Sequence, residues 1–332
     1  MKVVLATPNF HQPRGNTITV QRISDGLKCL GHTTEIISIT DTSISKLPEA
    51  DIIHGFHAYH FYSFIQTLKE KPKSFMITLT GTDLNHYLVD KDTRSDVITC
   101  IKDARTIHVF NDEAKEILMK EVPEVKHKTV MIPQGASNFK DSSSSYKKEE
   151  NTFLFVLPAG IRKVKNVPFA LETVKKLHDQ YPNIRLWIVG PILEEEEGQL
   201  VKELVNANKK WVSYLGQLAH EEMSGIYYQA DCILNTSHSE GQSSAILEAM
   251  GYGIPVLVAG NEGNKSIVSD QETGFIYHNQ NQFLDYAKKI MNNINLRQSI
   301  SISAKQYIAE HHSSAHEVEY LLKLYQEILK NR

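Results

Sequence analysis

The sequence predicts an α/β protein with two doubly wound parallel sheets. Three observations support this fold class. Short apolar runs of strand length alternate with amphipathic stretches of helix length along nearly the whole chain. The alternation stops once, at the polar and serine-rich residues 140–150, and then starts again. The 332 residues are enough for two domains that each bury a core of their own.

Residues 1–139 are expected to form the first domain. Apolar runs between turn-forming residues indicate its strands, and an apolar spacing of three to four residues indicates its helices. Gly31 supports one boundary, because glycine is favoured just after a helix. We expect strands at 3–7, 34–39, 51–55, 75–79, 106–110 and 129–132, with helices at 17–30, 62–68, 93–102 and 113–120.

After a linker at 140–150, residues 151–312 are expected to form the second domain, and 313–332 a terminal helix. The terminal helix is indicated by apolar residues that recur at helical spacing between 318 and 328. The glutamate run at 194–197 is expected to be a solvated loop or a helix start. Strands are expected at 152–157, 184–190, 212–215, 231–235, 256–258 and 275–277, and helices at 167–178, 200–206, 220–229, 243–252, 282–293 and 296–309.

Composition excludes several classes of protein. The chain is 41% hydrophobic and 23% charged with a net charge of −3, so no basic field points to nucleic acid. Cys29, Cys100 and Cys232 are widely spaced, which fits neither a disulfide framework nor a metal-binding pair. No apolar run has the length of a signal peptide or a membrane span. We therefore expect a cytoplasmic protein, for which peripheral membrane contact stays open.

Residues 231–258 form the most informative stretch. They predict a strand, a polar loop, a helix and a second strand, with Glu240 in the loop and Glu248 on the helix. In a parallel sheet, ligands bind in the loops at the carboxyl ends of the strands. Ser243 and Ser244 open the helix, whose free N–H groups favour an anion. An anion site flanked by two acids suggests a sugar nucleotide, although a single Glu is more often a solvated surface residue.

Two cations are expected on the same rim. Arg162 and Lys165 follow the first strand of the second domain and precede a helix. Cations at that position would neutralise a diphosphate and stabilise it as a leaving group. Taken alone, they could equally be ordinary surface charges, but their combination with Glu240 and Glu248 is harder to explain by chance.

With these residues in place, the second domain resembles the family 4 glycosyltransferases, of the retaining two-Rossmann type called GT-B. The Arg-x-x-Lys spacing is narrower here than in many members. A closer resemblance is to the subgroup that contains glycosyltransferase 1 domain-containing protein 1 and the bacterial selenosugar synthases. The matching residues are Gly160, Arg162 and Lys165; Ile188-Val189-Gly190-Pro191; Leu215-Gly216-Gln217-Leu218; Ser239-Glu240-Gly241; Leu247-Glu248-Ala249-Met250 with Gly253, Pro255 and Val256; Gly263-Asn264; and, in the first domain, Gly15-Asn16, Arg22, His57-Ala58-Tyr59 and Thr80-Gly81-Thr82-Asp83-Leu84.

The resemblance implies an architecture and a set of roles. The two domains would face each other across a cleft, and the terminal helix would pack back on the first domain. Arg162 and Lys165 would hold the donor diphosphate, Glu240 the hydroxyls of the transferred sugar, and Glu248 the ribose hydroxyls. The backbone at 216–218 would contact the uracil. Further donor contacts are expected from Gly15, Asn16, Gly190, Gly216, Gln217, Leu218, Gly241, Gln242, Ser243, Ser244 and Asn264.

Three residues of the first domain complete the expected site. His57 is a candidate catalytic residue, and Thr82 and Asp83 are candidates for the acceptor side, because all three follow strand ends. A His or Asp in such a loop is more often structural. Gly15 would let the backbone approach the donor phosphates closely.

No cofactor and no metal are expected; a UDP-sugar would be a co-substrate. Asp90-Lys91-Asp92 has the form of the Asp-x-Asp motif of metal-dependent transferases. It lies in the first domain, away from the donor rim, and so short a motif recurs by chance, so we discount it. No His/Cys cluster has metal-ligand spacing either.

The function expected from these features is retaining transfer of a sugar from a UDP-sugar, UDP-GlcNAc or UDP-glucose above all, to a small acceptor. Selenosugar or thiosugar synthesis is one form that it could take. Two alternatives stay open: a protein that binds nucleotide sugars without transferring them, and a UDP-sugar hydrolase or epimerase on the same fold. A dinucleotide-dependent oxidoreductase is disfavoured, because no Gly-x-Gly-x-x-Gly follows a first strand.

Overall fold

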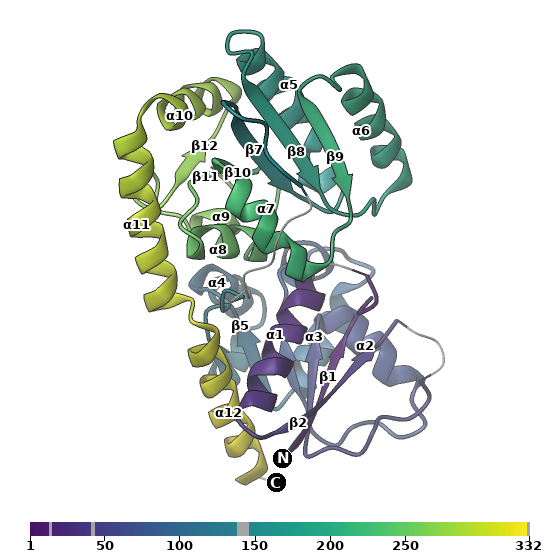
Figure 1. The fold of residues 1–332 in the computed structure, drawn as a ribbon. Coiled ribbons are helices and arrows are strands. Elements are labelled where there is room, and N and C mark those ends of the chain that lie inside the picture. Colours follow the sequence, from purple (N-terminus) through teal and green to yellow (C-terminus); the bar gives the residue numbers. More distant parts are fainter. Residues whose placement is uncertain (13–14, 41–43, 138–145, 331–332) are drawn as a thin grey trace. The chain divides into compact units, whose positions relative to one another are not determined.

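The structure is a computed structural model that describes residues 1–12, 15–40, 44–137 and 146–330. It separates into two compact units, which are described one at a time (Figure 1). Unit 1 combines Met1–Gly135 with His312–Arg332, and unit 2 is Ala136–His311. Each unit contains one six-stranded sheet in which all paired strands are parallel, so the predicted fold class is confirmed.

The sheet of unit 1 has the order β2-β1-β3-β4-β5-β6, so the strand order reverses between β1 and β3. Gly15 opens the helix that follows β1, and His57 lies between β3 and the helix that follows it. The strands of unit 1 are β1 (Lys2–Thr7), β2 (Thr33–Ser38), β3 (Ile52–Phe56), β4 (Met76–Thr78), β5 (Thr106–Val109) and β6 (Thr129–Met131). Its helices are α1 (Gly15–Cys29), α2 (Ala58–Thr67), the π-helix η1 (Asp83–Tyr87), α3 (Arg94–Asp103), α4 (Asp112–Glu121), the 3-10 helix η2 (Pro123–Lys128) and α12 (Ser314–Lys330).

Each face of this sheet has its own core. Apolar side chains of α2, α3 and α4 pack on one face. On the other face α1 lies beside α12, and both supply buried residues (Figure 1). Four residues of α12 are buried there at helical spacing: Val318, Leu321, Tyr325 and Ile328. The terminal helix therefore packs on the first domain, as the fold class predicted.

Two buried polar contacts also fix α12. Arg22 of α1 donates from Nε and Nη2 to the two carboxylate oxygens of Glu317, at 2.9 and 3.0 Å. The Tyr325 hydroxyl lies 2.6 Å from Nδ1 of His54 on β3. These polar groups are almost fully excluded from water, so each depends on its partner to satisfy its hydrogen bonds.

The Tyr325 contact is one end of a buried hydrogen-bond chain with a fixed direction. The Ile132 carbonyl only accepts, so His108 Nε2 donates to it at 2.9 Å. Burial lowers the pKa of both His108 and His54, so both rings are neutral. His108 Nδ1 then accepts from the Thr78 hydroxyl at 2.9 Å, and Thr78 accepts from His54 Nε2 at 2.6 Å. His54 Nδ1 is left as the acceptor for the Tyr325 hydroxyl.

The sheet of unit 2 has the order β12-β11-β10-β7-β8-β9. From β7 the sheet continues through β8 to β9 at one edge, and from β10 it continues through β11 to β12 at the other edge. The strand order therefore reverses between the neighbours β7 and β10. The strands are β7 (Phe153–Pro158), β8 (Ile184–Val189), β9 (Val212–Gly216), β10 (Cys232–Asn235), β11 (Val256–Ala259) and β12 (Phe275–Tyr277). The helices are η3 (Lys163–Lys165), α5 (Val167–His178), α6 (Glu195–Ala207), η4 (His220–Glu222), α7 (Met223–Gln229), α8 (Ser244–Gly251), α9 (Glu262–Lys265), α10 (Gln280–Asn292) and α11 (Ile294–His311).

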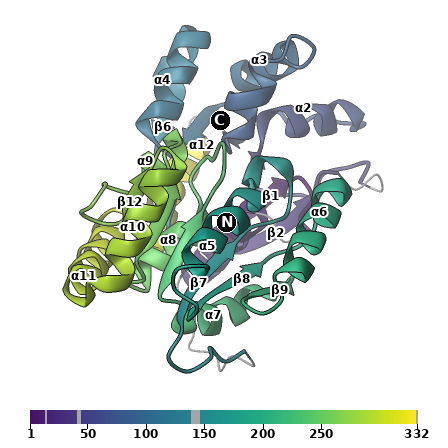
Figure 2. The ribbon, with the colours of Figure 1, turned by 90° about the horizontal axis from the view of Figure 1, so that it is seen from above.

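Helices cover both faces of this sheet. Apolar side chains of α5, α6 and α10 form the core on one face, and those of α7 and α8 form the core on the other. The views agree that α5 and α6 lie side by side (Figures 1 and 2). The long helix α11 contributes to both cores and contacts α8 and α10. Helices thus cover both faces of the sheet of unit 2, while loops extend from its strand ends.

The structure differs from the sequence expectation in a few local elements. A π-helix, η1, forms directly after β4, where a loop was expected. The glutamate run, by contrast, forms the N-cap and first turn of α6, which confirms the helix start that was one of its two expected states; acids there interact favourably with the helix dipole. The short helix α9 was not expected. Of the expected linker, residues 140–145 lie outside the described residues, whereas Lys148 pairs with Asp231 within unit 2.

Among the residues that the structure describes, no helix combines the length and the apolar character needed to cross a membrane.

Candidate active site

The expected donor residues gather at the carboxyl ends of β7 and β10. These two strands are neighbours at the position where the strand order of unit 2 reverses. Loops diverge there, which leaves a crevice that α/β proteins use for ligands. The loop after β7 carries Arg162 and Lys165, and the loop after β10 carries Glu240. The structure therefore brings Glu240 to Arg162 and Lys165, which lie roughly eighty positions earlier in the sequence.

Hydrogen bonds join these two loops. The Thr236 hydroxyl donates to the carbonyl of Lys165 at 2.9 Å, and the N–H of His238 donates to the carbonyl of Val164 at 2.9 Å. Lys165 ends η3, a single 3-10 turn that starts after Arg162. These hydrogen bonds fix the backbones of the two loops relative to each other. The side chains of Lys165 and Glu240 are therefore held close together.

Lys165 and Glu240 form an ion pair. Lys165 Nζ lies 2.5 Å from Glu240 Oε1, and the two side chains are 17% and 10% exposed. The same oxygen accepts from Asn235 Nδ2 at 2.9 Å and from the Ser237 hydroxyl at 2.7 Å. All three contacts end on Oε1, and within the described part of the chain no hydrogen bond reaches Oε2. That oxygen is positioned to accept from a ligand hydroxyl.

The environment keeps Glu240 ionised. Burial alone would raise its pKa. The charge of Lys165 and the hydrogen bonds from Lys165, Ser237 and Asn235 outweigh burial, so the pKa of Glu240 is lowered. A carboxylate held ionised in this way is an acceptor for hydroxyl groups and a poor general acid at neutral pH.

A second layer of amides orients Glu240. Asn264 Nδ2 donates to Asn235 Oδ1 at 3.1 Å and to the carbonyl of Ala259 at 2.9 Å. Asn235 in turn donates to Glu240. Asn264 was expected to contact the donor, but it is fully buried and lies behind Asn235. Its contacts therefore support the carboxylate indirectly.

Gly263 lets α9 approach the Glu240 loop. A Cβ on Gly263 would lie 1.9 Å from the carbonyl oxygen of Gly241 and 2.4 Å from that of Glu240. Both contacts are to backbone, which cannot rotate away. Gly241 and Gln242 lie in this loop, and Gln242 Nε2 reaches the Ser266 hydroxyl at 3.3 Å. The packing of α9 thus fixes the path of the chain between β10 and α8.

The start of α8 and Arg162 offer groups for an anion. Ser243 is the N-cap of α8, and its side chain makes no capping hydrogen bond. Ser244 is the first helical residue and is buried. Arg162 Nε is shielded from water without a hydrogen-bond partner in the described part of the structure. A buried donor without an acceptor is costly, so Arg162 is suited to a ligand oxygen.

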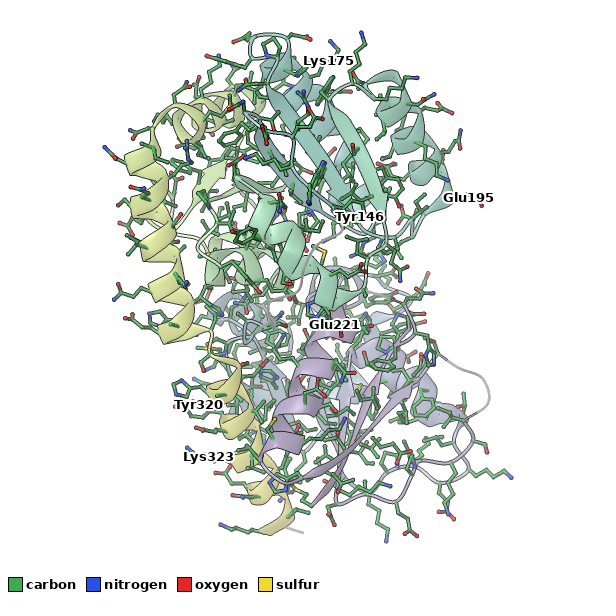
Figure 3. All side chains as sticks on the ribbon, in the orientation of Figure 1. Tyr146, Lys175, Glu195, Glu221, Tyr320 and Lys323 are labelled. Atoms are coloured by element: carbon green, nitrogen blue, oxygen red, sulfur yellow. The ribbon has the colours of Figure 1, made fainter. Side chains whose placement is uncertain are left out.

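Glu248 is more buried than a ligand-binding residue on an open rim would be. Its side chain is 2% exposed. Oε1 accepts from His220 Nε2 at 2.8 Å, and Oε2 accepts from the Tyr227 hydroxyl at 3.0 Å. His220 comes from η4, which Figure 3 marks by the neighbouring label Glu221. The expected ribose contact is therefore covered by side chains of the chain itself.

The loops after β8 and β9 form the rest of the rim in unit 2. Gly190 has a φ of 146°, and a Cβ there would lie 2.2 Å from the Ala159 carbonyl oxygen, so only glycine fits. Gly216 has a φ of 72°, and its carbonyl accepts from the N–H of Gly190 at 2.8 Å. Gln217 is exposed and Leu218 half-buried. Gly190, Gly216, Gln217 and Leu218 thus share the rim with the charged residues.

In unit 1, Gly15 and Asn16 open α1. A Cβ on Gly15 would meet nothing within 4 Å, so the backbone there is open to a ligand. Thr82 is exposed at the start of η1. These residues are described within unit 1 alone, and their expected roles stay predictions.

His57 and Asp83 have structural contacts. Asp83 is fully buried and accepts from the N–H groups of Ala58 and Thr80, at 3.0 and 2.8 Å, which ties the loop after β4 to the start of α2. His57 has a φ of 73°, which is rare for a residue with a side chain. Burial lowers the pKa of His57 although Asp83 acts to raise it, so the ring is neutral near pH 7. Strained backbone of this kind recurs at functional sites.

Sequence reasoning missed Asn235, Ser237, His220 and Tyr227. Asn235 ends an apolar strand, and a polar residue at that place was a usable signal for the carboxyl-end rim. His220 and Tyr227 lie on η4 and α7, and their sequence gives no sign that they meet Glu248.

In the Asp-x-Asp motif of the first domain, Asp90 accepts from the backbone N–H of Asp92 at 2.8 Å. Within the described residues, no group of three or more His, Cys, Asp or Glu side chains could hold a metal ion.

The fold and the site can be compared with known proteins. Among solved structures, a sucrose-phosphate synthase from Thermosynechococcus elongatus superposes with a TM-score of 0.81, at 14% identity, over 100% of both chains. HepE of Anabaena in complex with UDP and glucose superposes with a TM-score of 0.77, at 13% identity, over 98% of this chain and 100% of that one. These similarities support the two-domain, Rossmann-like GT-B fold.

Sequence comparison gives the family. The Xenopus tropicalis protein named Glycosyltransferase 1 domain-containing protein 1 is 27% identical over 317 residues, which cover 90% of each chain. The alpha-monoglucosyldiacylglycerol synthase of Acholeplasma laidlawii is 25% identical, over 92% of this chain and 93% of that protein. The model of the family described as Glycosyl transferases group 1 matches residues 138–307, just over half of the chain. The chain therefore belongs to the glycosyl transferases of group 1 and is a glycosyltransferase.

Proposed function

We propose that this glycosyltransferase moves a sugar from a UDP-sugar to a small acceptor with retention of configuration, as a family 4 type enzyme that needs no metal. The observation that carries the proposal is the ion pair of Lys165 and Glu240 beside Arg162, where the strand order of unit 2 reverses. This group offers cations for a diphosphate and one unoccupied carboxylate oxygen for a sugar hydroxyl.

The donor follows from the chemistry of the rim. Arg162, Lys165 and the first turn of α8 supply positive groups for two phosphates. Two similar structures contain UDP with glucose and UDP-glucose, and a pneumococcal relative is named as a UDP-N-acetylglucosamine–peptide transferase. UDP-glucose and UDP-GlcNAc are therefore the proposed donors.

The reaction balances without a nucleophile from the protein. The bond between the anomeric carbon and the β-phosphate oxygen breaks, and its electron pair leaves with UDP. The acceptor attacks the same face, and its proton passes to the departing phosphate oxygen. Lys165 and Arg162 stabilise the negative charge that grows on the diphosphate. Glu240, ionised and fixed by Asn235 and Ser237, holds the sugar in place.

The first test combines a donor screen with two variants. Thermal shift with UDP-sugars should reveal the donor, since binding to the folded state raises Tm. Lys165→Met should lower turnover roughly 100- to 1000-fold, because it removes charge that stabilises the leaving group. Glu240→Gln should lower turnover while UDP affinity stays near that of the wild type. Lys163→Met, in the same loop and exposed, is the control and should change neither.

Analysis of the product tests the stereochemistry of transfer and the identity of the acceptor. The proposal requires NMR to show the same anomeric configuration in donor and product, and activity that chelators leave unchanged. Selenophosphate and thiophosphate belong in the acceptor screen with small alcohols and sugars. Release of free sugar with water as the sole acceptor would indicate a hydrolase, and no turnover despite UDP-sugar binding would indicate a binding protein. Either outcome rejects the proposal.

A further inference from the structure

Glu248 is covered by two partners of different character. Tyr227 is almost fully buried on α7, and burial, with Glu248 adding to it, raises its pKa well above the usual value. Its hydroxyl thus stays protonated and donates to Oε2. His220 is 32% exposed and donates from Nε2 to Oε1 at 2.8 Å. The Tyr227 side chain is held in the core, whereas the His220 side chain is partly exposed to solvent.

The position of His220 couples it to the rim. It starts η4, a single turn that follows the loop 217–219 after β9. A side chain in a short turn can swing into water at little cost to the core, whereas Tyr227 cannot. With His220 in place, the Glu248 carboxylate is 2% exposed. Access of a hydroxyl pair to Oε1 therefore requires His220 to move.

We infer that His220 is a gate on the ribose subsite: it occupies Glu248 while the site is empty and gives way to the ribose hydroxyls of the donor. This inference rests on the proposed function, because it takes Glu248 as the ribose contact. The hydrogen bond that His220 makes is exchanged for one from a ribose hydroxyl, so the carboxylate is never left buried and unpaired.

Ligands differ in what they offer Glu248 once the gate is open. A nucleotide with both ribose hydroxyls replaces the hydrogen bond that opening the gate removes. A 2′,3′-dideoxy nucleotide opens the gate without replacing that bond. Pyrophosphate has no ribose and does not need the gate to open. Glu248 is thus the residue that favours ribonucleotides, and His220 lowers the affinity for every nucleotide that needs the gate open.

The gate also lowers affinity, because only the open fraction of the protein binds the nucleotide. Removing the hydrogen bond should raise that fraction. His220→Ala is expected to tighten UDP binding about three- to tenfold, in line with the loss of one hydrogen bond to a charged group. His220→Gln places an amide N–H near the position of Nε2 and should keep the wild-type affinity. His220→Asn is too short to reach and should behave like His220→Ala.

Isothermal titration of the full chain with UDP, 2′,3′-dideoxy-UDP and pyrophosphate tests the gate. The expected result is tighter UDP binding by His220→Ala and His220→Asn, wild-type affinity in His220→Gln, and unchanged pyrophosphate binding in all three variants. The preference for UDP over its dideoxy analogue should be the same in His220→Ala as in the wild type, since both nucleotides need the open gate and gain equally when it is already open.

Other results overturn the inference. When the wild type binds UDP, weaker binding by His220→Ala would make His220 an ordinary ligand contact, and equal binding would give His220 no role in nucleotide affinity; both leave the proposed function intact. Tightening in His220→Gln as well would assign the effect to the bulk of the ring. A change in pyrophosphate affinity of the same size would indicate a general disturbance of the site. No UDP binding by either the wild type or His220→Ala would reject the proposed function together with the gate.

Discussion

At the scale of single residues, Glu240 shows how burial and charge compete. The carboxylate is nearly buried, and burial opposes its ionisation. Lys165 lies 2.5 Å away, and its charge is the main influence that reverses this effect. Each group therefore compensates the other, and removal of one partner leaves the other charged and poorly solvated.

Lys165→Met should destabilise the protein at pH 7 by about 2–4 kcal/mol, because the Glu240 carboxylate then stays buried without a cation. The free energy of unfolding in urea measures this cost. Lys163→Met, whose side chain is exposed, should change it by less than about 0.5 kcal/mol. Equal effects of the two substitutions would mean that the ion pair contributes nothing to stability.

The sign of the pH dependence follows from the lowered pKa of Glu240. Stability from a depressed carboxyl pKa is present above the unfolded value, 4.5, and is lost as the pH falls through the folded pKa. Without Lys165, burial favours the protonated form of Glu240, so the stability difference between the wild type and Lys165→Met should be largest near neutral pH and shrink as the pH falls. A difference that grows on acidification would contradict the direction assigned to Glu240.

At the scale of elements, α9 is placed by a contact that only glycine permits. A Cβ on Gly263 would overlap the backbone of Gly241 and Glu240. Gly263→Ala must therefore displace either α9 or the loop that holds Glu240. We expect a loss of about 1–3 kcal/mol in stability and a large fall in turnover.

Gly251→Ala, at the end of α8, is the matched control for Gly263→Ala. Its Cβ would lie 3.5 Å from Ile308 Cγ2, an ordinary contact, and alanine favours the helix. Urea unfolding and turnover should both stay near the wild type in Gly251→Ala. Wild-type turnover in Gly263→Ala would show that the position of the loop does not matter for the chemistry.

The terminal helix α12 depends on polar contacts as well as on apolar packing. Tyr325→Phe removes the hydroxyl that donates to His54 and leaves a buried acceptor unpaired. The expected cost is about 1–3 kcal/mol in the free energy of unfolding. Tyr320→Phe is the same change on the exposed side of α12, where Figure 3 shows Tyr320 pointing outward, and it should be neutral. Equal stability of both variants would show that the hydrogen bond between Tyr325 and His54 does not stabilise the packing of α12.

The buried hydrogen-bond chain through His54 and His108 makes the stability of unit 1 sensitive to acid. Burial, with a contribution from His108, lowers the pKa of His54 well below 6.5, and burial also lowers that of His108. The unfolded chain takes up protons below that pH and the folded chain does not, so stability is full above pH 6.5 and falls below it. Each histidine contributes a slope of up to about 1.4 kcal/mol per pH unit. His54→Gln should flatten the decline between pH 6.5 and 5 in urea unfolding; an unchanged slope would mean that His54 does not titrate on unfolding.

At the scale of the whole molecule, periodicity was enough for the two parallel sheets, because a buried parallel strand is a short apolar run in any context. It was enough for α5, whose bounds agree with the expected 167–178. Periodicity did not predict the π-helix η1. Asp83, its first residue, accepts hydrogen bonds from the backbone N–H groups of Ala58 and Thr80. The contact with Ala58 joins segments 25 positions apart and leaves no local pattern.

The candidate site divides in the same way. Arg162, Lys165 and Glu240 follow strand ends, and the rule that parallel strands meet at one edge was enough to group them. The covering of Glu248 by His220 and Tyr227 could not be predicted, because it depends on where η4 and α7 pack. The indirect place of Asn264 likewise depends on Asn235 lying between it and Glu240.

Unit 1 is discontinuous in sequence, and this arrangement predicts how the chain responds to truncation. Ending the chain after His311 removes α12, which buries Val318, Leu321, Tyr325 and Ile328. At roughly 2 kcal/mol for each side chain, the loss approaches the whole stability of a typical domain, ~5–15 kcal/mol. It also leaves Arg22 without its buried partner Glu317. Unit 1 should therefore unfold, while unit 2 keeps its continuous chain and its cores.

Hydrogen exchange measured by mass spectrometry can separate the two units. In the truncated chain, β1, β3 and α1 should lose their protection, whereas β7, β8 and α5 should keep it, because α12 supplies no side chain to the cores of unit 2. The full chain with Tyr320→Ala, an exposed position of α12, should exchange like the wild type throughout. Equal loss of protection in both units would show that they fold as one cooperative body, and retained protection of β1 and α1 would show that the helix is dispensable for unit 1.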